Sequence, residues 1–158
     1  LSLPFLDEAT ASTLKADDQG IDLYAETFHP DLPGLAFLGQ FNLTGPYLPV
    51  LELQARWLAS TWAEGEPEPD KMRDALATGA YQPVRGAGVP MHMMAVLFSR
   101  LGGVEPDLAE YPDLERALLF GPLSPASFRL TGADAEATAY ERTIKSAEAF
   151  GHIVGKEF

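Results

Sequence analysis

The sequence of 158 residues contains no cysteine and is poor in basic side chains. Without cysteine, a disulfide framework, a thiolate metal site and a cysteine nucleophile are all excluded. The 11 lysines and arginines stand against 23 aspartates and glutamates, which gives a formal net charge of -12. Because an acidic surface repels phosphate groups, nucleic acid and anionic membrane surfaces are not expected partners.

Long apolar runs are also missing from the sequence. No stretch approaches the ~20 apolar residues that cross a bilayer, and the first residues lack the basic region of a signal peptide, so we expect a cytoplasmic protein. With 46% hydrophobic residues, the chain can nevertheless bury a core. It begins with Leu1 rather than methionine and opens on an apolar stretch, so we interpret it as part of a longer protein.

Proline, glycine and hydrophobic periodicity divide the chain into short elements. The ranges expected to form strands are 21–28, 35–39 and 127–130. The ranges expected to form helices are 9–15, 46–63, 70–79, 91–100 and 136–150, together with a helical stretch that follows Pro106, breaks at Pro112 and ends at Gly121. This pattern predicts an α+β fold that is mainly α-helical with two or three short strands. We treat 1–158 as a single domain, with extended segments over 1–45 and a helical region over 46–158.

Two glycines enclose a polar loop just before the second expected helix. Gly39 and Gly45 allow the backbone to come close to a planar ligand, and Gln40, Asn42 and Thr44 supply hydrogen-bonding side chains between them. A helix N-terminus behind such a loop favours negative charge, because its first N–H groups are unpaired. From the spacing alone, however, we favour a simple strand, turn and helix whose glycines only satisfy turn geometry.

The stretch that contains this loop resembles a characteristic segment of the flavin-containing monooxygenases. In that family, a strand ending in glycine is followed by a second glycine, then by a proline and a Glu-Leu-Gln-x-Arg-Trp helix. The matching residues are Gly39, Gly45, Pro49, Glu52, Leu53, Gln54, Arg56 and Trp57. The likeness is gapless over 35–57.

A second block supports the resemblance. The residues from Gly121 to Gly132 are similar to the family's C-terminal element Gly-Pro-x-Ser/Thr-Pro-x-x-Tyr-Arg-Leu-x-Gly. Two departures stand out: Asn42-Leu43 occupies the place of a frequent Gln-Pro, and the family's Pro-Gly-x-Trp after Gly132 is absent. The role of that last turn is therefore in doubt here.

The resemblance implies the C-terminal fragment of a flavoprotein with two dinucleotide-binding domains, whose phosphate-binding loops would lie before Leu1. Such an enzyme uses FAD and NADPH to transfer oxygen to nucleophilic nitrogen or sulfur in small molecules. The resemblance reverses our interpretation of the polar loop. Its expected cofactor-binding residues are Gly39, Gln40, Asn42, Thr44 and Gly45. No catalytic residue and no metal site are expected, and the chain alone should bind no cofactor and be inactive.

The remaining side chains are interpreted as structural or as contacts to the missing N-terminal domains. Glu52, Gln54, Arg56 and Trp57 would hold the helix against those domains. Apolar side chains around Phe37, Phe41 and Trp57 would be left uncovered without them, which predicts a homodimer.

Other chemical groups give no site. His29, His92 and His152 have no second ligand at metal spacing, so we interpret them as packing or surface residues. The carboxylates of 64–70 are interspersed with prolines and are expected to form a solvated linker. The alternative to the enzyme fragment is a stand-alone acidic, α-rich interaction module that retains the family's scaffold.

Overall fold

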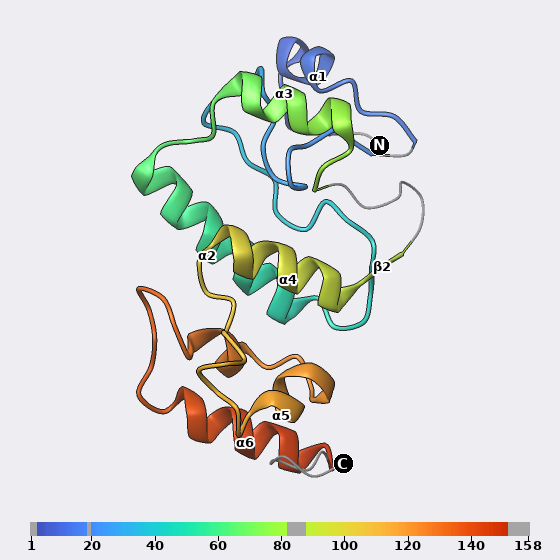
Figure 1. Ribbon diagram of the computed structural model, residues 1–158. Coiled ribbons are helices and arrows are strands. Elements are labelled where there is room, and N and C mark those ends of the chain that lie inside the picture. The colour runs from blue at the N-terminus through green and yellow to red at the C-terminus, as the bar shows by residue number, and fades with distance from the viewer. Residues whose placement is uncertain (1–2, 19, 82–87, 152–158) are drawn as a thin grey trace. The chain divides into compact units, whose positions relative to one another are not determined.

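The computed structural model describes residues 3–18, 20–81 and 88–151. The chain forms two compact units, Leu1–Leu97 and Phe98–Phe158. We predicted one domain over 1–158, divided at residue 45 into extended segments and a helical region. The two units neither confirm nor contradict it, so it stays a prediction. Figure 1 labels the α-helices of both units and the strand β2 (Val89–Pro90).

The first unit contains the longest helix and three shorter ones (Figure 1). The helices are α1 (Glu8–Leu14), α2 (Leu48–Glu64), α3 (Pro69–Thr78) and α4 (Met91–Leu101), the last of which runs into the second unit. Local sequence explains the ends. The Asp7 side chain caps α1 by accepting from the Thr10 N–H at 3.0 Å, and Gly79 ends α3 in the left-handed conformation. The helices expected over these ranges are confirmed.

The strands lie where the sequence did not predict them. A parallel pair joins β1 (Leu43–Thr44) to β2 (Val89–Pro90), with Leu43 opposite Val89. The strand predicted over 21–28 is wrong, because the chain turns sharply at Ala25 and Glu26, both at positive φ. The ranges 21–28 and 35–39 form isolated β-bridges instead of the predicted strands: Phe28 pairs with Tyr24 and with Ala36.

The second unit consists of short helices and connecting turns. Its own helices are α5 (Glu115–Phe120), the 3₁₀ helix η1 (Pro125–Arg129) and α6 (Ala139–Ala149). The strand predicted over 127–130 is wrong, because Pro125 starts a helical turn there and the Ser124 hydroxyl caps it through the Ala126 N–H. The helix predicted over 136–150 is confirmed within a few residues. Of the helical stretch predicted after Pro106, the part beyond Pro112 is confirmed as α5, and the part before it is wrong, because the chain forms turns there.

The fold class is therefore mainly α with a small sheet, as predicted. Among the helices in the described ranges, none combines the length and the apolar character needed to cross a bilayer.

Aromatic rings form part of the core of the first unit. The rings of Phe28 and Trp57 meet edge to face at 5.5 Å between centroids, and Tyr24 lies 6.5 Å from Trp57. Residues 23–28 are all buried although they belong to no helix and no regular strand. A buried segment of this kind must find hydrogen-bond partners for its backbone outside regular secondary structure.

Candidate functional site

The polar loop Gly39–Pro46 presents its side chains in alternation. Gln40, Asn42 and Thr44 are exposed, whereas Phe41 is half-buried and Leu43 is buried. The chain bends at Gly39, Phe41 and Gly45 and is a strand only at Leu43–Thr44, so the polar side chains reach solvent from a bent segment. Within the described ranges none of the three makes a hydrogen bond to another residue, and all three are exposed to solvent.

Glycine is required at one end of this loop. Gly45 has φ +123°, and a Cβ atom built there would lie 2.7 Å from Met91 Sδ of α4. Both the backbone conformation and the close neighbour exclude a larger residue without rearrangement. Gly39, at φ +72°, is less crowded, since its Cβ would lie 3.1 Å from Leu51 Cδ2.

Hydrogen bonds from Tyr47 and from β2 hold the backbone of the loop. The Tyr47 hydroxyl accepts from the Leu43 N–H at 2.8 Å and donates to the Phe41 carbonyl at 3.2 Å. The ring of Tyr47 also lies parallel to that of Phe41, with 6.3 Å between centroids. From β2, the Val89 N–H donates to the Asn42 carbonyl at 2.7 Å. The loop therefore has a fixed backbone and an exposed row of polar side chains.

The loop leads directly into the N-terminus of α2. Tyr47 is the N-cap residue and makes no side-chain capping hydrogen bond, Pro49 lies in the first turn, and that turn carries no acidic residue. The first N–H groups of a helix carry a partial positive charge. This end of α2 is thus suited to an anionic group next to the loop.

Behind the loop, Gln54 joins three segments of the first unit. Its side chain is fully buried on α2. Its Oε1 accepts from the Gly39 N–H at 2.9 Å, while its Nε2 donates toward the Glu26 carbonyl at 3.1 Å, Thr27 Oγ1 at 2.8 Å and the Phe37 carbonyl at 3.2 Å. The Gly39 N–H lies at one end of the Gln54 amide and the three acceptors lie at the other. The amide oxygen must therefore face Gly39 and the amide nitrogen the three acceptors.

Sequence reasoning assigned Gln54 and Trp57 to contacts with another domain, and this was wrong: both are buried inside the first unit. A signal for it was present. Gln54 falls on the same helical stripe as Val50, Leu53 and Leu58, all of them buried. A polar residue on such a stripe must be satisfied internally.

The apolar surface also differs from the prediction. Phe37 and Trp57 are only 8% and 5% exposed, so they leave no surface to cover, and Phe41 is half-buried. The exposed apolar side chains near the loop in sequence are instead Leu38 at 50% and Leu48 at 79%. The residues that approach the loop from far along the sequence, such as Met91, carried no local signal.

One carboxylate of the expected solvated linker has a structural role. Glu66 accepts from the Gly34 N–H at 3.0 Å and from Trp62 Nε1 at 2.8 Å. It therefore attaches the connection between α2 and α3 to the turn at Gly34. Glu64, Glu68 and Asp70 are exposed, as expected of a linker.

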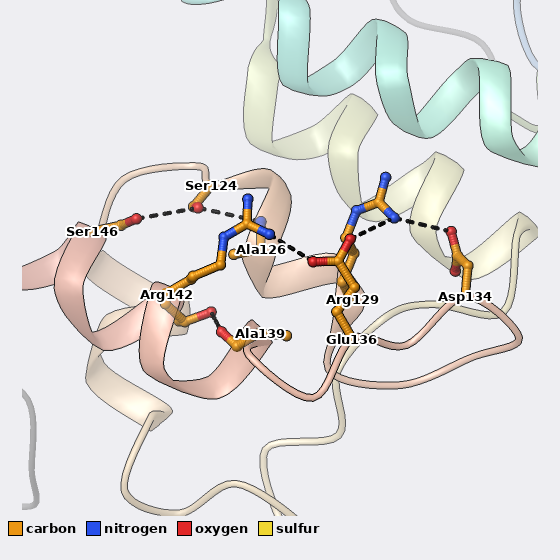
Figure 2. A network of polar contacts seen from close by, with 9 residues as sticks. Ser124, Ala126, Arg129, Asp134, Glu136, Ala139, Arg142 and Ser146 are labelled. Carbon is orange, nitrogen blue, oxygen red and sulfur yellow. Dashed lines mark hydrogen bonds and ion pairs between the residues drawn. The ribbon is translucent and has the colours of Figure 1, made fainter.

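The second family-like block builds a polar network in the second unit (Figure 2). Glu136 accepts from Arg129 Nη1 at 3.0 Å and from Arg142 Nη1 at 2.6 Å, and Asp134 lies 3.7 Å from Arg129 Nη1. Figure 2 shows that the two arginines come from η1 and α6 and converge on one carboxylate. The ion pairs of this network connect η1, α6 and the turn between them.

Within the described ranges, no group of three or more histidine, aspartate or glutamate side chains could hold a metal ion. His29 accepts from the Asp31 N–H through Nδ1 at 3.2 Å, and burial lowers the pKa of its imidazole. His92 is exposed on α4, and His152 lies outside the described residues.

Comparison with known proteins confirms the resemblance. No protein-family model matches the chain. Flavin-containing monooxygenase 5 of Rattus norvegicus is 29% identical over 93% of this chain and 30% of its own length. Flavin-containing monooxygenase 1 of Mus musculus is 29% identical over 91% of this chain and 31% of its own length. The chain is thus similar to flavin-containing monooxygenases over nearly all its residues, and it spans about a third of the length of these relatives.

Proposed function

We propose that this chain is the C-terminal, flavin-facing part of an FAD- and NADPH-dependent monooxygenase that acts in the cytoplasm. The observation that carries the proposal is the similarity to flavin-containing monooxygenases over 93% of the chain. The exposed polar loop Gly39–Pro46, which precedes an uncapped helix N-terminus, supports a position beside the cofactor. The substrates that we propose for the parent protein are small molecules with a nucleophilic nitrogen or sulfur atom.

The residues of the loop fit a flavin ring edge. Gln40, Asn42 and Thr44 are exposed and carry hydrogen-bond donors and acceptors, and the ring edge carries carbonyl and N–H groups that can pair with them. The N-terminus of α2 would stabilise negative charge that develops on the reduced ring. FAD, when bound, supplies the redox chemistry and NADPH the electrons. The protein groups named here bind and orient the ring.

The chain alone lacks a site for the pyrophosphate of FAD in its sequence, so we propose that it binds the cofactor weakly and catalyses nothing by itself. Titration with FAD, followed by quenching of the flavin fluorescence, tests this. Tight stoichiometric binding would contradict it.

A chimera tests the function directly. This chain would replace the matching segment of rat flavin-containing monooxygenase 5, the relative that aligns with 93% of it. We expect the purified chimera to retain FAD and to form oxygenated product from a tertiary amine or a thioether with NADPH. Asn42→Ala in the chimera should lower flavin retention or turnover, whereas Glu68→Gln, on the exposed linker, should change neither. A folded chimera without flavin would instead favour the interaction module.

A further inference from the structure

The amide of Gln54 has more acceptors than it has hydrogens to offer. Its Nε2 carries two hydrogens, and three acceptors lie within 3.2 Å: the carbonyls of Glu26 and Phe37 and the hydroxyl of Thr27. That hydroxyl itself donates to the Ala25 carbonyl at 2.9 Å. Since Oε1 holds the Gly39 N–H, one side chain connects the 23–28 turn to the start of the polar loop.

The turn that Gln54 contacts contains Glu26, a glutamate that is almost fully buried. Glu26 is 9% exposed, and its backbone has φ 55°, next to Ala25 at φ 46°. In this left-handed region residues other than glycine are strained, and such strain is kept only where the surroundings enforce it. Among the described residues, no donor contacts the Glu26 carboxyl group, and burial raises its pKa to about 7.

Among the described residues, no other charge accounts for the raised pKa of Glu26. The ionisable neighbours on its own segment are Asp22, Tyr24 and His29, and the charged residues beside Gln54 on α2 are Glu52 and Arg56. None of these contributes to the shift of the Glu26 pKa, which has burial as its cause. Ionisation of this group near neutral pH therefore places a buried charge, with no donor among the described residues, at the same residue whose carbonyl Gln54 binds.

We propose that Gln54 is the positioning residue of the Gly39–Pro46 loop and that it transmits the protonation state of Glu26 to the Gly39 amide. With Glu26 neutral, the turn stays buried and Gln54 holds both the turn and the loop. When the carboxyl group ionises, hydration draws the turn outward, the Glu26 carbonyl leaves Gln54, and the hydrogen bond to Gly39 weakens. The relevance of this coupling to a flavin rests on the proposed function, whereas the coupling itself belongs to this chain.

Hydrogen exchange of two glycine amides tests the coupling within one molecule. The Gly39 N–H is held by Gln54, and the Gly34 N–H is held by Glu66, a separate side chain. Protection factors, corrected for intrinsic exchange, would be measured by NMR on the 158-residue chain between pH 5.5 and 8.5. We expect protection of Gly39 to fall about tenfold as the pH rises through about 7, the Glu26 pKa, while that of Gly34 stays constant.

Variants distinguish a specific coupling of Glu26 to the Gly39 amide from a general loss of structure in the first unit. In Glu26→Gln, the protection of Gly39 should no longer depend on pH. In Gln54→Met, it should fall at least about tenfold at every pH, without a change at Gly34. Glu66→Gln should act in the opposite way, on Gly34 alone.

Two results would overturn the proposal. One is an unchanged Gly39 protection in Gln54→Met, and the other is the same pH dependence in Glu26→Gln as in the parent chain. If Gln54→Met exposes both amides because it unfolds the unit, the Glu26→Gln comparison alone decides. None of these measurements requires FAD, so a chimera without flavin would refute the proposed function and leave this inference standing.

Discussion

The buried amide at Gln54 and the charged network at Glu136 hold their units together in different ways. Gln54 is fully buried and neutral, and it contacts four polar groups of the backbone and of Thr27. Glu136 meets two arginines, but its side chain is 37% exposed and that of Arg142 is 53% exposed. Exposed ion pairs contribute little because water screens them, whereas a buried polar group that loses its partners incurs a desolvation penalty. The neutral junction should therefore matter more than the charged one.

The largest expected effect comes from Gln54→Leu, which breaks the junction. The change keeps the bulk of the side chain but leaves the Gly39 N–H and the Glu26 and Phe37 carbonyls without their buried partner. We expect the free energy of unfolding to fall by roughly 3 to 5 kcal/mol. Urea unfolding followed by Trp57 fluorescence measures it. Gln40→Ala, at an exposed glutamine, is the control and should change stability by less than about 0.5 kcal/mol.

Gly45→Ala separates the effect of packing from that of the Gln54 hydrogen bonds, because it crowds the end of the loop without removing a hydrogen bond. The new Cβ would meet Met91 Sδ and would force alanine to φ +123°. We expect a loss of roughly 2 to 3 kcal/mol. Gly65→Ala is a matched control, since Gly65 has φ +113° and open space around it, so only the backbone strain should remain. If the two losses are equal, the contact with Met91 has no energetic weight.

Glu26→Gln removes the ionisable group at the junction. Burial raises the folded-state pKa of Glu26 from 4.5 to about 7, so the folded state prefers the protonated form and loses stability as pH rises between these values. The variant should therefore be more stable than the parent chain at pH 8, by roughly 1 to 2 kcal/mol after allowance for partial exposure, and equal to it at pH 4. Urea unfolding at both pH values measures this. Glu68→Gln should show no such dependence.

Glu136→Gln has the smallest expected effect, because it breaks ion pairs that are exposed or only partly buried: the side chains of Arg129, Glu136 and Arg142 are 26%, 37% and 53% exposed. We expect a loss of about 0.5 to 1 kcal/mol, which shrinks as salt is added. Hydrogen exchange of the α6 amides at low and high ionic strength measures it. Glu148→Gln, also on α6, serves as the control. A loss as large as that of Gln54→Leu would reverse the ranking of the two regions.

The sequence predicted the helices because their signals are local. Periodicity over several turns, Pro49 in a first turn and Gly79 at an end all act within one element. The strands failed for the opposite reason. A two-residue strand such as β1 exists only because Val89 reaches it from far along the chain, and no pattern of Leu43 and Thr44 indicates that partner.

The sequence indicated which residues form the candidate loop, but not which residues hold that loop in place. The glycines and polar residues of the loop were visible as a motif, and the family resemblance gave them a function to test. The contacts behind the loop were not visible, because Gln54 meets groups 15 to 28 positions away. The left-handed turn at Ala25 and Glu26 carries no glycine that would have marked it.

The position of Gln54 in the chain also bears on how the first unit is made. The turn at 23–28 and the loop that starts at Gly39 both precede Gln54 in the sequence. During synthesis, which proceeds from the N-terminus, they leave the ribosome before the side chain that joins them. Until α2 has emerged, the carbonyls of Glu26 and Phe37 are bound by water rather than by Gln54. A chain that stops before Gln54, in the first turns of α2, would therefore leave the nascent turn and loop unjoined.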